Sequence, residues 1–386
     1  MKHKNIYFII LICLLSAAFL FIGNRLARDD TSSRPYFEEF EVHPAVVAEI
    51  IDIYESNDLF GPFATGTIIT FMANITSGDF SNETVLAEQA ITAAMADIER
   101  EVTAGDRVLL VYDEFSDIFF FVDYMRTNIL LIFGIIIFAL IVLFGGKKGI
   151  YSIVALSFTC MSIFFILMPG ILAGRNIYLV TIFVSVFITL STLLIAIGPN
   201  KKAMSAALGC LGGTLAAGLL MAIMDAFLNL TGLIDQESMF LLNLPSHDPI
   251  NLRSIIFAGV IIGALGAIMD VAMSISSSLW EVHQSSKNIG FAGLFKSGIN
   301  IGRDILGTML NTLILAYIGS SLSLVLVITF YAGTTSPLGL FNQEMIVVEI
   351  LRALIGSFGI FLAIPLTAGI CGWMYANRGR KIEDID

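Results

Sequence analysis

The chain has 386 residues, of which 56% are hydrophobic and only 14% are charged, and its mean hydropathy is +0.86. This composition is typical of an integral membrane protein and excludes an ordinary soluble globular domain. The formal net charge of −11 is unevenly spread, because residues 24–124 hold 20 of the 32 acidic residues and 5 of the 21 basic ones. That segment carries −15, which leaves +4 for the rest of the chain.

Residues with catalytic or metal-binding chemistry are sparse and scattered. All four cysteines lie in apolar runs: Cys13, Cys160, Cys210 and Cys371. None has the spacing of a zinc site, and we expect them to be small buried side chains. The four histidines lie in the N-terminus or in loops, and no Ser/His/Asp, H-E-x-x-H or Walker pattern is present. The sequence therefore predicts a protein that is not an enzyme, with no catalytic residue, metal or cofactor and no nucleic-acid partner.

The first apolar run, Ile6–Ile22, follows the basic residues of the N-terminus. Its length suits either a cleaved signal peptide or an uncleaved signal anchor. Phe21-Ile22-Gly23-Asn24-Arg25 is a poor small-x-small cleavage site, which favours the anchor. Residues 1–23 are therefore predicted to be a cytoplasmic N-terminus followed by the first transmembrane helix.

Residues 24–124 are predicted to form a small acidic α+β domain. Two segments rich in Val, Ile and Thr predict strands: Pro44–Tyr54 and Thr65–Ile75. Glu83–Glu99 predicts a helix, because apolar residues recur near the helical period. Two shorter apolar segments after a Gly-Asp turn predict a hairpin-like pair: Val108–Tyr112 and Ile118–Val122.

Seven further apolar runs are each near or above the roughly 20 residues that a membrane span needs. They are Asn128–Phe144, Ile150–Met168, Ile177–Ile197, Ala203–Leu230, Ser254–Leu279, Asp304–Tyr331 and Met345–Ala376. Backbone groups in the bilayer must be satisfied internally, so these runs are predicted to be helices. The expected fold is mainly α: about eight transmembrane helices, with the α+β domain between helices 1 and 2. Residues 125–377 are the expected seven-helix transmembrane domain, and residues 378–386 the cytoplasmic tail.

The connections between the runs alternate in charge. One set is basic: Lys147-Lys148, Lys201-Lys202, Lys287 with Lys296, and Arg378 with Arg380 and Lys381. The other set is weakly charged or acidic: Arg175, Asp235–Arg253 and Thr334–Glu344. By the positive-inside rule, both termini are predicted to be cytoplasmic, and residues 24–124 to lie outside the plasma membrane.

Ionisable residues inside the predicted spans are the candidate functional residues. Asp270 lies deep in an apolar run, where a charge costs several kcal/mol, and such a residue is a functional candidate. Arg303 and Asp304 open the next run from the same side of the membrane, so the three form a candidate proton or ion relay. The plainer alternative is an ion pair that fixes helix register.

A second group of charges is expected near the outer face. Asp225 and Arg352 lie at comparable depth and are expected to pair, whereas Glu349, three residues before Arg352, is the alternative partner. Small residues surround both groups, at Gly259, Gly263 and Gly266 and again at Gly209, Gly213 and Ala217. Such spacing lets helix backbones approach closely. The cytoplasmic stretch Ser285–Ile301 suits a helix lying on the membrane surface.

Two motifs resemble the YibE/F-like bacterial membrane proteins. They are Gly263–Leu279 (GALGAIMDVAMSISSSL) and Ser297–Tyr317 (SGINIGRDILGTMLNTLILAY). Three shorter segments are similar too: Val122–Arg126, Gly198–Lys202 and Glu349–Arg352. The resemblance implies a multi-pass bacterial plasma-membrane protein with an external domain after the first helix, and it implies no particular activity.

A mid-span Asp followed by a loop and an Arg in the next helix is also similar to the proton-relay half of SecD/SecF and RND-type export proteins. That fold-level analogy would place Asp270 and Arg303 at relay positions. The chain departs from the pattern in having two more helices before Asp270 and a single external domain.

Two functions from different classes follow. The first is a transporter or export component, with Asp270 as the candidate proton carrier. The alternative is a non-transporting scaffold or sensor whose external domain binds a partner. The expected partners are the lipid bilayer and either another membrane protein or further copies of the chain.

Overall fold

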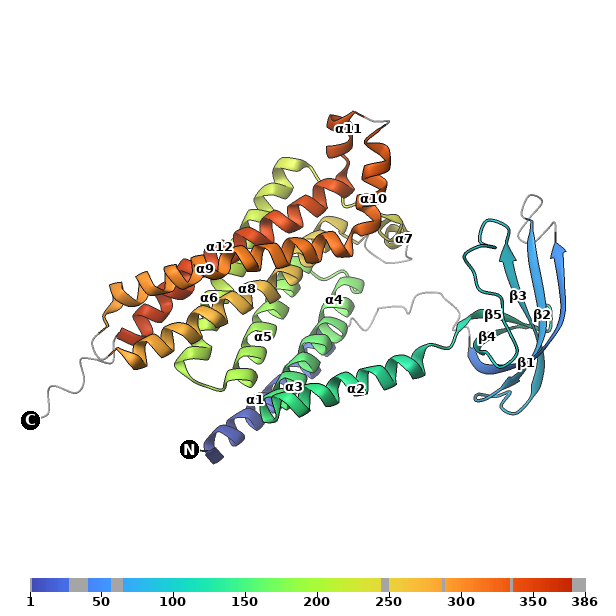
Figure 1. Ribbon diagram of the computed structural model, residues 1–386, viewed down its shortest axis with the longest axis horizontal. Helices are drawn as coiled ribbons and strands as arrows, with labels where there is room; N and C mark the ends of the chain where they lie inside the picture. Colours follow the sequence, from blue (N-terminus) through green and yellow to red (C-terminus); the bar gives the residue numbers. More distant parts are fainter. Residues whose placement is uncertain are drawn as a thin grey trace, which may run out of the picture. The chain divides into compact units, whose positions relative to one another are not determined.

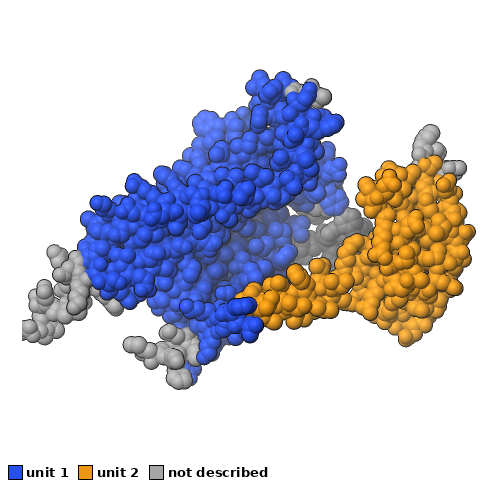
Figure 2. Space-filling model, viewed as in Figure 1, with its two compact units in different colours: residues 1–35, 142–386 blue, residues 36–141 orange. Residues whose placement is uncertain are grey.

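The computed structural model describes residues 2–27, 41–56, 65–243, 250–286, 289–333 and 336–376. It confirms the predicted fold class: eight helices are long and apolar enough to cross a membrane, and a five-stranded sheet follows the first of them and precedes the second along the chain (Figure 1). The chain divides into two compact units, Met1–Pro35 with Val142–Asp386, and Tyr36–Ile141 (Figure 2). The predicted tail, residues 378–386, and Lys287 lie outside the described residues.

The sheet is a closed barrel with the strand order β1-β2-β3-β5-β4. Its strands are β1 (Val42–Ser56), β2 (Gly66–Ile75), β3 (Thr84–Thr92), β4 (Arg107–Asp113) and β5 (Ile118–Tyr124). All pairs are antiparallel except β3 with β5. Ile69, Phe71 and Ala73 of β2 alternate along the strand and are fully buried, as the period of two in a half-buried strand requires.

The helix predicted over Glu83–Glu99 is wrong, because its first half is strand β3 and its second half is a series of turns. Ala87, Gln89 and Ile91 are buried at a spacing of two residues, and β3 pairs with β2 along its whole length. Asn82, at φ +70°, makes the turn between the two strands. Strand pairing and burial therefore decided the conformation over the local helical pattern.

An ion pair marks the junction between the barrel and the next helix, α2 (Thr127–Gly145). Arg126 Nη1 donates to Asp123 Oδ2 at 2.7 Å, and this hydrogen bond holds the pKa of Asp123 below its ordinary value. Both residues belong to a segment that resembles the YibE/F-like proteins. None of the residues of α2 is buried in the described structure.

The remaining helices begin with α1 (Lys2–Ala27), which precedes the barrel. After α2 follow α3 (Lys147–Ser162), the π-helical turn η1 (Ile163–Leu167), α4 (Met168–Leu172), α5 (Ile177–Ile197), α6 (Lys201–Leu228), α7 (Gln236–Leu242), α8 (Leu252–Ser285), α9 (Phe291–Ser320), α10 (Leu322–Tyr331), α11 (Pro337–Phe341) and α12 (Glu344–Ala376). Helix α12 packs against α6, α8 and α9, and α5 packs against α6 and α8 (Figure 1). The largest apolar cluster joins these helices.

Small residues make the contact between α6 and α12. A methyl group added at Gly213 would lie 2.9 Å from both the Ala363 Cβ and the Gly359 carbonyl oxygen. A methyl group at Gly359 would in turn lie 3.2 Å from the Ala217 Cβ. The small-residue spacing predicted on α6 is therefore a packing feature, since any larger side chain would force these helices apart.

A buried network of hydroxyl groups ties α6, α8 and α12 together at one end. The Tyr375 hydroxyl lies 2.9 Å from Ser205 Oγ and 3.0 Å from Ser276 Oγ, and the two serine oxygens are 2.8 Å apart. Ser276 Oγ also donates to the Lys202 carbonyl oxygen at 2.8 Å. Each hydroxyl has partners, so the network stabilises one arrangement of the three helices.

Helix α9 begins thirteen residues before the predicted start of its span at Asp304 and ends at Ser320. The stretch predicted as a surface helix, Ser285–Ile301, instead supplies the end of α8 and the first part of α9. Leu294 and Gly298 are buried, and the Gly298 backbone packs against Leu279 of α8 and Ala368 of α12. Contact with these two helices therefore draws the segment into the bundle, and it places Arg303 and Asp304 near the middle of α9.

Candidate functional site

Asp270 lies on a narrow exposed stripe of α8, a helix that is otherwise largely buried. Gly259, Gly263 and Gly266 precede it on the same stripe, at intervals of three or four residues that keep them on one helix face. The opposite face carries fully buried residues such as Ile268, Val271, Ala272 and Ile275. Half-buried Ser274 and Ser277 continue the stripe beyond Asp270. A line of small and polar groups therefore runs along the surface of this apolar helix.

The stripe is open on the glycine side. A methyl group added at Gly259 or Gly266 would meet no neighbouring atom within 4 Å, in contrast to one added at Gly213. Gly263 differs, because a methyl group there would lie 3.0 Å from the Tyr317 hydroxyl of α9. Packing within the described chain therefore does not require glycine at two of the three positions before Asp270.

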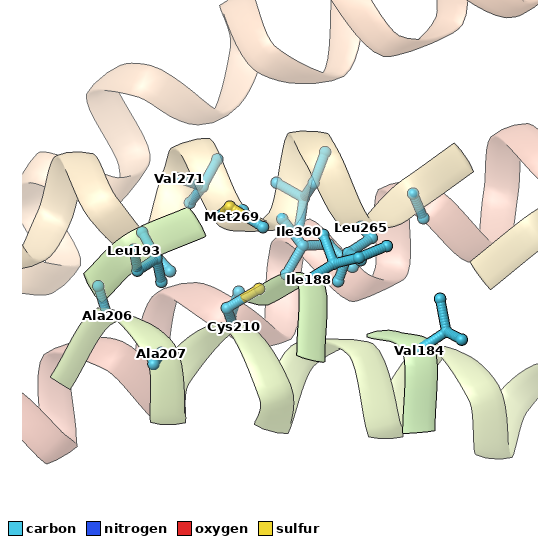
Figure 3. Close-up of a cluster of buried hydrophobic side chains, with 14 of the residues drawn as sticks. Val184, Ile188, Leu193, Ala206, Ala207, Cys210, Leu265, Met269, Val271 and Ile360 are labelled. Atoms are coloured by element: carbon cyan, nitrogen blue, oxygen red, sulfur yellow. The ribbon is translucent and has the colours of Figure 1, made fainter. Parts of the chain in front are cut away.

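Other polar groups approach Asp270 from inside the bundle. Cys210 on α6 lies within electrostatic range of Asp270, and the Cys210 sulfur lies 3.8 Å from Thr189 Oγ1 on α5. Ser185 Oγ, one turn before Thr189, is buried and has no hydrogen-bond partner among the described residues. Around these groups the core is apolar: Figure 3 shows Cys210 with Ile188, Met269 and Ile360. Asp270 therefore lies on the open stripe, with an apolar core on the opposite side of its helix.

Arg303 and Asp304 are not joined to Asp270 in the structure. The described residues contain no ion pair between them, and all three side chains are exposed. Gly263 packs against Tyr317 and Leu279 against Gly298, which fixes the alignment of the antiparallel helices α8 and α9. Asp270 is seven residues after Gly263, so it lies at the level of residue 310, seven residues before Tyr317. It is nine residues before Leu279, so the second contact places it at the level of residue 307, nine residues after Gly298. Arg303 therefore lies one to two turns of α9 away from that level.

The charges that were expected near the outer face pair within one helix. Arg352 Nη1 donates to Glu349 Oε1 at 2.7 Å, three residues earlier on α12. Asp225, the expected partner, makes no ion pair with Arg352, and its Oδ1 has no hydrogen-bond partner among the described residues. An i,i+3 partner is already on the same face, so this pairing needs no particular spacing between two helices.

Tyr317 was not among the functional residues predicted from the sequence. Its hydroxyl lies between the glycine backbones of α8 and α12, since it is near the methyl positions of both Gly263 and Gly356. The hydroxyl oxygen is buried and finds no hydrogen-bond partner in the part of the chain that the structure describes. A tyrosine within an apolar run was the available signal, because a buried tyrosine hydroxyl usually needs a partner.

The helices that carry these groups are the part of the chain that a known family shares. The family model of the YibE/F-like proteins matches residues 133–377, from within α2 to the end of α12. The chain belongs to the YibE/F-like family. This YibE/F-like protein has multiple candidate membrane spans, and the matched region includes Asp270, Arg303 and Asp304. No curated protein and no solved structure matches the chain.

Proposed function

We propose that this multi-pass membrane protein is a transporter or export component of the bacterial plasma membrane, and that Asp270 carries a proton during its cycle. The observation that supports the proposal is the open stripe of glycine and serine that contains Asp270 on α8. Nothing in this role requires an enzymatic reaction.

The carboxyl group of Asp270 can be either neutral or ionised in this position. Deep in a membrane helix, burial favours the neutral form, and contact with water or polar groups favours the ionised form. No basic side chain is paired with Asp270 in the described structure, so no fixed charge holds it ionised. A change in its exposure to water would therefore load or release the proton, which is the step that proton coupling needs.

The proton occupancy of Asp270 can be tested without knowing the substrate. Dicyclohexylcarbodiimide is an apolar reagent that modifies protonated carboxyl groups. In isolated membranes we expect it to modify Asp270, and we expect the modified fraction to fall as the pH is raised, because the carboxylate does not react. The fraction is measured by mass spectrometry of the peptide that contains Asp270.

Glu349 is the matched comparison, because it also lies in a membrane helix but is paired with Arg352. Its modification should stay well below that of Asp270 at every pH. Absence of modification at Asp270 across the pH range, with reaction at other carboxyl groups, would contradict the proposal.

We further propose the orientation that the charge pattern predicts, with both termini cytoplasmic and the barrel outside. In a chain without native cysteines, a cysteine at the exposed barrel position Asp79 should react with a membrane-impermeant maleimide in intact cells. A cysteine at the exposed position Lys148 should react only after the cells are permeabilised. The reverse pattern would reject this orientation.

A scaffold or sensor role is the second candidate, and the barrel supplies the observation for it. Ile51, Ile53 and Tyr54 of β1 are 43–54% exposed. Among the described residues, strand β4 pairs with β1 only over Val42–Val46, so Glu49–Glu55 has β2 and not β4 as its paired neighbour. A strand segment with exposed apolar side chains suits a partner that adds an extended segment. In that case the barrel would be essential and the charge of Asp270 would not be.

A further inference from the structure

Helix α9 has its apolar and small residues toward the bundle and polar residues on the opposite, exposed face. The buried residues Leu294, Gly298 and Gly302 face the bundle, where Gly298 packs against Ala368 and Gly302 against Ile364, both on α12. The opposite face is polar and exposed over three turns: Asn300, Arg303, Asp304, Gly307 and Asn311. A transmembrane helix that borders lipid normally presents apolar side chains there.

Lipid is an unfavourable neighbour for this face. Arg303 and Asp304 lie near the middle of the 30-residue helix, and neither has an ion-pair partner among the described residues. A charged side chain at the centre of a membrane helix costs about 2.5–3.5 kcal/mol by insertion scales. Adjacent residues on a helix point in different directions, so the two charges cannot neutralise each other well within one chain. Another polar surface must therefore cover this face.

Gly307 indicates that the covering element is a closely packed helix. A methyl group added at Gly307 would meet no atom within 4 Å, so its own chain does not require glycine there. Glycine inside a helix costs about 1 kcal/mol relative to alanine. Glycine at a contact between membrane helices lets their backbones approach. The position is explained if a second helix crosses α9 at Gly307.

The two charges flank this crossing point in a self-complementary way. At 3.6 residues per turn, Arg303 lies about 40° to one side of Gly307 and Asp304 about 60° to the other. A two-fold axis along the membrane normal would bring the arginine side of one helix against the aspartate side of its copy. We propose that α9 packs in parallel against α9 of a second copy of this chain, with Gly307 at the crossing and two Arg303–Asp304 ion pairs between the copies.

The other residues on the polar face of α9 also suit a contact with a second copy of the chain. Asn300 and Asn311 lie on the seam one or two turns from Gly307, where side-chain amides hydrogen-bond across membrane helices. Helix α2 is apolar from Ile129 to Gly145 and offers no group that could neutralise Arg303 or Asp304. A second copy of α9 supplies both an arginine and an aspartate at the same depth in the membrane as Arg303 and Asp304. This interface is independent of the role proposed for Asp270, which lies on α8.

Charge reversal separates this interface from any role of the two residues within one chain. In Arg303→Asp both positions are acidic, and in Asp304→Arg both are basic. Two differently tagged copies are expressed together in full length, and their co-purification from mild detergent is measured. Each variant should co-purify with itself about tenfold less than the parent chain does, because like charges across an interface cost more than 1.4 kcal/mol. The mixed pair should recover to near the parent level, since it restores both ion pairs.

The mixed pair also controls for misfolding, because it contains the same two chains. A mixed pair no better than either self-pair would overturn the proposal, and so would self-pairs at the parent level. Failure of the two variants to accumulate even when expressed together would equally overturn it, by showing that the charges act within one chain.

Cysteine crosslinking in membranes locates the contact. In a chain without native cysteines, Gly307→Cys should form a disulfide-linked dimer on mild oxidation. The control is Phe361→Cys, at a position on α12 that is 56% exposed but on an apolar part of the helix, and it should remain monomeric. Equal crosslinking at both positions, or crosslinking of the α9 cysteine only to a different protein, would contradict the α9 contact.

Discussion

Replacing Asp270 with asparagine should abolish function while the protein still accumulates in the membrane. Asparagine has nearly the same shape and cannot ionise, so packing on α8 is kept and proton exchange is lost. Function is measured as rescue of cells that lack the gene, and as proton uptake by proteoliposomes that contain a pH-sensitive dye. Uptake should fall to the level of protein-free liposomes. Asp270→Glu should retain part of the activity, because it keeps the ionisable group.

Asp225→Asn is the matched control, since it removes a carboxylate from the neighbouring membrane helix α6 that has no ion pair among the described residues. It should leave proton uptake unchanged. If Asp270→Asn works as well as the parent chain at every proton gradient, the relay is wrong. The scaffold or sensor role would then be the better explanation.

Replacing Gly213 with leucine should prevent stable folding of the membrane bundle. Even a methyl group at this position would lie 2.9 Å from the Gly359 carbonyl oxygen and the Ala363 Cβ. Overpacking of a core costs about 1–3 kcal/mol where neighbours can shift, and backbone atoms on α12 can shift little. We expect accumulation to drop several-fold and the apparent melting temperature in detergent to fall, measured by thermal aggregation of the purified protein.

Gly134→Leu provides the comparison for this variant. Gly134 lies in α2, where an added methyl group would meet no atom within 4 Å, and leucine matches its apolar surroundings. It should accumulate like the parent chain. Equal loss for the two variants would show that leucine in any span is harmful, and it would remove the evidence for a critical contact between α6 and α12.

The positions of the membrane helices could be predicted from the sequence because the bilayer leaves the backbone few options. An apolar run of sufficient length must satisfy its own hydrogen bonds, and helix is the simple solution. The barrel was harder, since apolar residues recur near the helical period over Glu83–Glu99, the segment that contains β3. Its conformation depends on pairing with β2, and a single sequence does not reveal that contact.

The candidate residues could be identified individually from the sequence, but their contacts with one another could not be predicted. Position along a helix follows from residue count, so Asp270 could be placed well inside its helix, which the structure gives as α8, Leu252–Ser285. The start of α9 depends on Gly298 fitting between Leu279 and Ala368, which hydropathy cannot report. With the start misplaced, Arg303 and Asp304 were predicted at the beginning of the helix and not near its middle. The choice between Asp225 and Glu349 as partner of Arg352 likewise required the distance between helices.

The hydroxyl network of Ser205, Ser276 and Tyr375 limits the movements open to this protein. Because it fastens α6, α8 and α12 at one end, these helices form a block that cannot separate there without breaking several buried hydrogen bonds. An alternating exposure of Asp270 would then come from displacement of α5 or α9 against this block, or from tilting at its far end. In the proposed transport cycle, the serines and the tyrosine would be the stationary point, and the opposite ends of the three helices would move relative to it.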